Sequence, residues 1–287
     1  MMGPTLERAM VRATSLSQAL ALLQETAIPS QPLCGGTDLM VQAMTTQADG
    51  RRWVDVGSVD ELRGISLDAN GLRIGAATTC AELRVHPLVA THAPLLAQCA
   101  GQVGARAIQE RATPGGNLAN ASPAADLAPA LIAHGAQVEL VSASATRRLP
   151  VEDFFISYRH TALSTDELIL ALHLPLSGDA LCWHRKVGTR RAQAITKVAL
   201  AASGLWVKGE AHCRIGMASV APVPLRCRKT EDWLRRHALE PGWMDAAADI
   251  LREEISPIDD LRSTADYRRT VAGNLLMAFL RRFQAAR

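Results

Sequence analysis

Apolar residues recur along the chain with two periods, one typical of helices and one typical of strands. Residues 14–26 place apolar side chains at helical spacing behind a Thr-Ser pair, which predicts a capped amphipathic helix. Pro29 and Pro32 are expected to end that helix, and Leu33 is expected to head a strand that enters a glycine loop. A further strand is predicted at residues 53–56, so the chain should begin with a small unit of βαβ-like order.

Strand-like and helix-like patterns alternate over the rest of the chain. In the middle, strands are predicted at 72–76, 136–141 and 167–175, and helices at 81–87, 93–104 and 127–133. The stretch from Pro175 to Gly178 suits a seam between two units. Beyond it, the expected elements are strands at 199–207 and 211–219 and helices at 230–237, 244–254 and 265–282. Strands followed by helices are typical of an α+β unit.

The composition is that of an ordinary globular protein. Of 287 residues, 48% are hydrophobic and 21% are charged, which suits two or three compact units. The net charge of +3 is too small to indicate nucleic acid as a partner. No apolar run has the roughly 18 residues of a membrane span, and the N-terminus shows no export signal. We therefore expect a cytoplasmic protein, with export in company with a signal-bearing partner as the alternative.

Cysteine and histidine spacing does not indicate a metal site. The six cysteines contain no Cys-x-x-Cys pair, and no two histidines stand four positions apart. We expect no metal in this chain and reduced, buried thiols.

Two segments combine paired glycines with small hydrogen-bonding side chains. They are Pro32-Leu-Cys-Gly-Gly-Thr-Asp-Leu-Met-Val41 and Ala112-Thr-Pro-Gly-Gly-Asn-Leu-Ala-Asn-Ala-Ser-Pro-Ala-Ala-Asp126. Glycine lets the backbone approach a ligand closely, and successive N–H groups in such turns suit phosphate oxygens. Neither segment is a P-loop or a Gly-x-Gly-x-x-Gly fingerprint. Either alone is more often an ordinary turn, but together they predict a clamp for the two ends of one pyrophosphate.

These two segments, with four others, resemble the FAD-carrying medium subunit of molybdenum hydroxylases, the family of xanthine dehydrogenase and carbon monoxide dehydrogenase. The other four are Thr161-Ala-Leu-Ser-Thr-Asp-Glu-Leu168, Lys186-Val-Gly-Thr-Arg-Arg191, Ala218-Ser-Val-Ala-Pro-Val-Pro224 and Asp260-Leu-Arg-Ser-Thr-Ala-Asp-Tyr-Arg-Arg269. The implied fold class is α+β, with a p-cresol methylhydroxylase/vanillyl-alcohol oxidase-type FAD-binding fold. Its two α/β subdomains would be residues 1–57 and 58–176, followed by a C-terminal α+β domain at 177–287.

The resemblance also implies which residues bind FAD. Backbone amides of the first segment would hold the pyrophosphate, and the second segment would close over it. Asp126 would take ribityl or adenine-side hydroxyls, Val103 would lie near the flavin ring, and Ile169 and Lys186 would contact the cofactor. The implied cofactor-binding residues are Leu33, Cys34, Gly35, Gly36, Thr37, Asp38, Val103, Thr113, Gly116, Asn117, Asn120, Asp126, Ile169 and Lys186. No catalytic residue and no metal ligand is implied.

Four of these residues also have a simpler interpretation. Asp38 and Asp126 precede apolar runs and fit helix caps, Ile169 fits a core position, and Lys186 fits a surface ion pair.

The chain departs from the family pattern at three places. Gln109-Glu110 precede the second segment, Pro114 stands before its glycines, and Val103 replaces a residue that is often aromatic. No Arg-x-x-His segment suits a covalent flavin link, so non-covalent FAD is expected.

The implied activity is that of an FAD-dependent oxidoreductase subunit that transfers electrons. A large subunit would oxidise the substrate at a molybdenum cofactor, and a small subunit would relay electrons through two [2Fe–2S] clusters. The FAD of this chain would pass them to NAD⁺, oxygen or another acceptor. The implied assembly is a heterotrimer or a dimer of heterotrimers. Two alternatives stay open: a stand-alone reductase like UDP-N-acetylenolpyruvoylglucosamine reductase, and a non-catalytic scaffold subunit with a degenerate flavin site.

Overall fold

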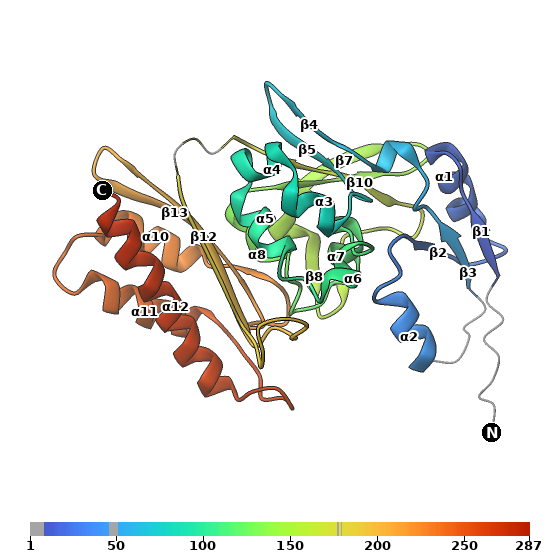
Figure 1. Ribbon diagram of the computed structural model, residues 1–287. Coiled ribbons are helices and arrows are strands. Elements are labelled where there is room, and N and C mark those ends of the chain that lie inside the picture. The colour runs from blue at the N-terminus through green and yellow to red at the C-terminus, as the bar shows by residue number, and fades with distance from the viewer. Residues whose placement is uncertain (1–8, 46–50, 177, 179) are drawn as a thin grey trace.

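Three sheets follow one another along the chain, together with one two-stranded ribbon, in the part of the chain that the structure describes (Figure 1). The computed structural model describes residues 9–45, 51–176, 178 and 180–287. No helix in these ranges combines the length and the apolar character needed to cross a lipid bilayer.

The first sheet is parallel and has the order β1-β3-β2. Its elements, in chain order, are β1 Met10–Arg12, α1 Leu16–Gln24, β2 Ser30–Leu33, α2 Leu39–Thr45, β3 Arg52–Asp55 and η1 Asp60–Leu62. Helix α1 begins as expected, because the Ser15 side chain accepts a hydrogen bond from the N–H of Gln18. Its buried side chains, Ala19 and Leu20 among them, pack in one cluster with Val54 of β3.

A strand was expected to start at Leu33, and this expectation was wrong. Helix α1 already ends at Gln24, and Leu33 is the last residue of β2 rather than its first. Pro32 stands inside this strand. A proline is tolerated there because β2 is an edge strand, which pairs with β3 and with no other strand among the described residues.

The second sheet is antiparallel and has the order β4-β5-β10-β6-β7. Its strands are β4 Ile65–Asp68, β5 Gly71–Gly75, β6 Gln137–Val141, β7 Thr146–Pro150 and β10 Leu168–Leu174. The helices of this part are α3 Cys80–Val85, α4 Pro87–His92, α5 Pro94–Ala100, α6 Arg106–Gln109, α7 Pro114–Ala119, α8 Ala128–Ala133 and α9 Val151–Phe154. A two-stranded ribbon, β8 Phe155–Ser157 and β9 His160–Thr161, completes it. Strand and helix side chains such as Ile74, Leu131 and Leu172 form one buried core.

The Gly115-Gly116-Asn117 stretch is helical, where a loop was expected. It lies in the first turns of α7, whose N-cap residue Thr113 accepts a hydrogen bond from the N–H of Gly116. Pro114 is the first residue of this helix. Proline is favoured there because its missing N–H would have no partner within the helix. The Pro114 departure from the family pattern therefore fits the local structure.

The third sheet lies between two groups of helices (Figure 1). Its antiparallel strands, in sheet order, are β11 Leu181–Val187, β12 Val198–Val207, β13 Glu210–Ala218 and β14 Leu225–Arg226. One face is covered by α10 Arg228–His237, α11 Trp243–Glu254 and α12 Ala265–Ala285. Helix α8 packs on the other face. It approaches so closely that a Cβ at Gly216 would lie 2.3 Å from the carbonyl oxygen of Pro129.

Candidate cofactor-binding site

A cavity of about 1690 Å³ lies where the three parts of the chain meet. Its wall includes the glycine segment after β2, helix α7 with the residues that follow it, and residues 193–196 and 256–258 of the third part. The volume exceeds the roughly 300–1,000 Å³ of an ordinary small-molecule pocket. The cavity therefore suits an extended ligand of dinucleotide size.

Most of the expected cofactor-binding residues line this cavity. They are Cys34, Gly35, Gly36, Thr37, Asp38, Val103, Thr113, Gly116, Asn117, Asn120, Asp126 and Ile169. Leu33 and Lys186 are outside the lining. The Leu33 side chain is buried beneath the segment with Ala43 and Trp53, and the Lys186 side chain is 8% exposed in an ion pair.

The first glycine segment presents a row of free backbone donors. The N–H groups of Gly36, Thr37, Asp38 and Leu39 donate to no acceptor within the described residues. Gly36 has φ +75°, a conformation that favours glycine, and a Cβ at Gly35 would lie 2.0 Å from the carbonyl oxygen of Arg111. Consecutive free N–H groups in such a turn make a site for the oxygens of a phosphate.

The second glycine segment contributes in a different way. The N–H groups of Gly115, Gly116 and Asn117 already donate to Ala76 O, Thr113 Oγ1 and Thr113 O. These three amides are therefore not available to a phosphate, although the sequence suggested that this segment would offer free N–H groups. A Cβ at Gly116 would meet only Thr113 Oγ1, at 3.1 Å, and the residue faces the cavity. The missing side chain leaves room for a ligand to approach the backbone.

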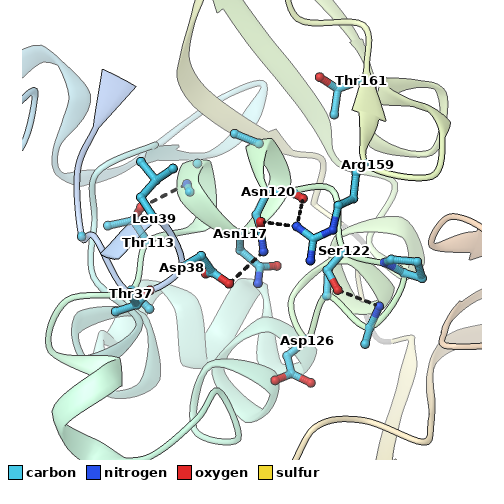
Figure 2. Close-up of a pocket in the computed structure, with 18 of the residues that line it drawn as sticks. Thr37, Asp38, Leu39, Thr113, Asn117, Asn120, Ser122, Asp126, Arg159 and Thr161 are labelled. Carbon is cyan, nitrogen blue, oxygen red and sulfur yellow. Dashed lines mark hydrogen bonds between the residues drawn. The ribbon is translucent and has the colours of Figure 1, made fainter. Parts of the chain in front are cut away.

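Asn120 connects the two glycine segments. Its Nδ2 donates to Asp38 Oδ1 at 2.9 Å, and its Oδ1 accepts from Gln42 Nε2 at 3.2 Å and from Arg159 Nη1 at 2.8 Å. Figure 2 shows Asp38, Asn120 and Arg159 pointing toward one another at the cavity wall. Burial raises the pKa of Asp38, and the nearby guanidinium of Arg159 opposes that shift.

Asp126 lies on another part of the wall and pairs with Lys186. Its Oδ2 is 2.8 Å from Lys186 Nζ, and its Oδ1 accepts from the Thr196 hydroxyl at 2.6 Å. Lys186 Nζ also donates to the carbonyl of Gln102 at 2.9 Å. Burial raises the pKa of Asp126, and the Lys186 ammonium opposes the shift. The two residues join the start of the third part to the second.

The simpler interpretations of four residues can be compared with this geometry. Asp126 does not cap α8, because the N-cap position is Leu127 and no side chain caps that helix. Lys186 pairs in a largely buried position and not on the surface. Ile169 is 6% exposed and does both things: it belongs to the core and lines the cavity. The Asp38 carboxylate accepts from Asn120, and α2 begins one residue later.

Several cavity residues were not identified from sequence. Arg159 is one of them, and it contacts Asn120 of the second glycine segment (Figure 2). Residues 193–196 reach the wall beside Val103, because the N–H of Gln193 donates to the carbonyl of Gly104 at 2.9 Å. The family-like segments end at Arg191 and begin again at Ala218, so they gave no signal for this loop. Within the described residues, no group of three or more potential metal-ligating side chains is present.

Comparisons with known proteins cover almost the whole chain. The model of the FAD-binding domain in molybdopterin dehydrogenase matches residues 5–177, and that of the CO dehydrogenase flavoprotein C-terminal domain matches residues 183–283. The chain is 30% identical to the xanthine dehydrogenase FAD-binding subunit of Escherichia coli O157:H7, over 90% of this chain and 89% of that protein. It is also 30% identical to the carbon monoxide dehydrogenase medium chain of Hydrogenophaga pseudoflava, over 91% and 92%.

A solved structure of a related enzyme has the same fold as this chain. Carbon monoxide dehydrogenase from Hydrogenophaga pseudoflava, solved without the Mo-pyranopterin moiety of its cofactor, matches with a TM-score of 0.90 at 27% identity. The match covers 97% of this chain and 96% of that one.

Proposed function

The chain belongs to the family of FAD-binding subunits of molybdopterin dehydrogenases, and from this premise we propose that its FAD is the exit for electrons from a heteromeric molybdenum hydroxylase. In this proposal the electrons arrive from [2Fe–2S] clusters of a small partner subunit. They leave to NAD⁺, oxygen or another acceptor. FAD supplies the redox chemistry when it is bound, and the protein binds and orients it.

The observation that carries the proposal is the row of four free N–H groups at Gly36–Leu39, in the same cavity as the exposed backbone of Gly116. Free amides suit a diphosphate, and the missing Cβ of Gly116 leaves space for a ligand against the backbone. We propose that Cys34 to Asp38 hold the diphosphate and that Thr113, Gly116, Asn117 and Asn120 face it from the other side. Both groups of residues line one cavity of suitable size.

The other proposed cofactor-binding residues lie away from the diphosphate. Val103 and Ile169 offer apolar surface for the flavin ring, and Asp126 offers carboxylate oxygens to hydroxyls of the ligand. Lys186 and Leu33 do not line the cavity and support it indirectly. Lys186 fixes the side chain of Asp126, and Leu33 packs beneath the first glycine segment.

The division of the chain into 1–57, 58–176 and 177–287 is part of this proposal. The three sheets fall at residues 10–55, 65–174 and 181–226, which supports these boundaries.

The proposed assembly contains two further subunits. Its large subunit carries a molybdenum cofactor and its small subunit carries the [2Fe–2S] clusters, in a cytoplasmic heterotrimer or dimer of heterotrimers. Support comes from relatives of matching length that are named as medium chains or FAD-binding subunits, which implies other chains beside them.

The test is flavin reduction in the presence and absence of partners. We expect the complex purified with both partners to show flavin bands near 370 and 450 nm, roughly the positions of the free cofactor. In stopped-flow experiments, purines, aldehydes, N-heterocycles or carbon monoxide should reduce this flavin only when both partners are present.

Two results would contradict the proposal. A complex without flavin bands would support the scaffold alternative, and substrate oxidation by this polypeptide alone would support a stand-alone reductase.

A further inference from the structure

Arg159 stands in an unusual backbone conformation at the cavity wall. It occupies the two-residue turn between β8 and β9, where its φ is +55°. Residues other than glycine, asparagine and aspartate rarely adopt this left-handed region, and such strain concentrates at functional sites.

One side of the guanidinium is fixed by Asn120. Arg159 Nη1 donates to Asn120 Oδ1 at 2.8 Å and to the Asn120 carbonyl at 3.4 Å. The same Asn120 carboxamide donates to Asp38. A single carboxamide therefore connects Arg159 to the segment that carries the free N–H groups of Gly36–Leu39.

Apart from the Tyr158 ring, whose centre lies 5.9 Å from Cζ of Arg159, the rest of the guanidinium has no hydrogen-bond partner in the part of the chain that the structure describes. Within the described residues, Nε and Nη2 of Arg159 donate to no acceptor, and Arg159 forms no ion pair with a carboxylate. Other cavity cations differ in this respect, since Arg262 and Arg268 both pair with Asp260. Arg159 thus brings free donors to the cavity, together with a positive charge that acts on the Asp38 carboxylate without forming an ion pair with it.

The acidic groups of the cavity leave the free donors of Arg159 unoccupied. Glu167 is held by Arg147 and Asp126 by Lys186, while Asp38 interacts with Arg159 through its charge and is hydrogen-bonded to Asn120. The free donors of Arg159 therefore remain available to an anionic ligand that lies against the first glycine segment.

We propose that Arg159 binds the diphosphate of FAD directly, from the side opposite the free amides of Gly36–Leu39. The proposal rests on the proposed function, because it takes FAD as the ligand of this cavity. A guanidinium offers two parallel N–H donors to phosphate oxygens, a geometry that lysine does not reproduce. Asn120 holds the guanidinium in place, and the diphosphate compensates its charge.

The experiment is an FAD titration of the flavin-free complex at two ionic strengths. Arg159→Gln should weaken FAD binding on the order of 10- to 100-fold, the range expected for charged hydrogen bonds. The affinity of this variant should also depend less on salt than that of the unsubstituted complex, because one screened charge contact is gone. Arg159→Lys should lose less affinity than Arg159→Gln, since it keeps the charge without the two-pronged geometry.

Arg235→Gln is the matched control. Arg235 is an exposed arginine on α10 that pairs with Asp232 and does not line the cavity. The Arg235→Gln substitution removes the same charge as Arg159→Gln, and it should change neither the FAD affinity nor the salt dependence of that affinity.

A second variant separates direct binding from a purely structural role. If Arg159 served only to neutralise and position Asp38, Asp38→Asn in the Arg159→Gln background would restore full FAD affinity. That result would overturn the proposal, as would an unchanged affinity in Arg159→Gln. If the unsubstituted complex failed to bind FAD, the proposed function itself would fail.

Discussion

Glycine has three different roles among the residues of this site. Gly35 and Gly115 are required by the protein itself, since a Cβ would lie 2.0 Å from Arg111 O and 2.9 Å from Ala76 O, respectively. Gly36 is required because its φ of +75° disfavours a residue with a Cβ. Neither reason applies to Gly116, where an added Cβ would meet Thr113 Oγ1 at 3.1 Å and no other described atom within 4 Å outside its own helix backbone. We take the proposed ligand as the main reason for a glycine at that position.

This difference gives a residue-scale prediction. Gly116→Ala should change the free energy of unfolding by no more than about 1 kcal/mol, because the better helix former offsets the tight contact with Thr113. The same variant should bind FAD at least about 10-fold more weakly, since the new methyl group occupies ligand space. Thermal unfolding and FAD titration measure the two effects separately.

Gly115→Ala is the matched comparison for Gly116→Ala. Its Cβ meets the backbone of Ala76, so it should destabilise the protein by about 1–3 kcal/mol. Full FAD affinity in Gly116→Ala would show that the ligand does not approach this residue.

At the scale of elements, segments with a clear apolar period could be predicted from sequence, among them the short strands β5 and β6 and the short helix α8. Helices α11 and α12 and strands β12 and β13 were predicted because each carries its own pattern. Helix α7 was missed, since two glycines and a proline do not favour a helix interior. Here the proline is at N1, and the cap and the backbone of Ala76 supply the hydrogen bonds.

In the candidate site, too, features with a local sequence pattern could be predicted and contacts between distant residues could not. Paired glycines revealed the two segments, because a close backbone approach leaves that local signature. Arg159 and the pairing of Lys186 with Asp126 had none, since each depends on residues many positions apart in the chain. Such contacts are set by tertiary packing and not by local pattern.

The Lys186–Asp126 pair gives a prediction at the scale of elements. It joins β11 to Asp126, two residues before α8, with side chains 8% and 16% exposed. Removing one partner leaves the other charge buried, so Lys186→Met should destabilise the protein by about 3 kcal/mol. Adding Asp126→Asn should recover part of that loss, and denaturant unfolding of the three variants would measure the coupling. Additive effects of the two substitutions would contradict a direct pair.

At the scale of the whole molecule, the parts are joined by buried polar contacts as well as by apolar packing. Ser203 of β12 donates to the carbonyl of Ala133 in α8 at 2.7 Å, across the boundary between the second and third parts. Glu152 of α9 accepts from Arg214, Arg226 and Arg228 of the third part. The loop of residues 193–196 reaches the cavity wall from the third part, and its Gln193 N–H donates to Gly104 of the second part across this boundary.

The burial of His134 should make the stability of the whole molecule depend on pH. It follows α8 at this boundary, is 3% exposed, and has no hydrogen-bond partner for either ring nitrogen among the described residues. Burial lowers the pKa of His134 to about 4 from 6.5. Below pH 6.5 the unfolded chain therefore binds a proton that the folded protein does not bind. The folded state should lose about 3 kcal/mol from this group as pH falls from 6.5 to 4.

Replacing His134 with leucine tests directly whether this histidine causes the predicted loss of stability at low pH. His134→Leu has no titratable group and leaves no unpaired ring nitrogen, so it should be at least as stable as the unsubstituted protein at pH 7. Carboxylates with shifted pKa values, such as Glu167 and Asp126, also contribute to the pH dependence, but they are the same in both proteins. The difference in free energy of unfolding between the two proteins isolates the histidine. It should be constant above pH 6.5 and grow in favour of His134→Leu toward pH 4. A difference that stays constant over the whole range would mean that His134 is protonated, or solvated, in the folded state.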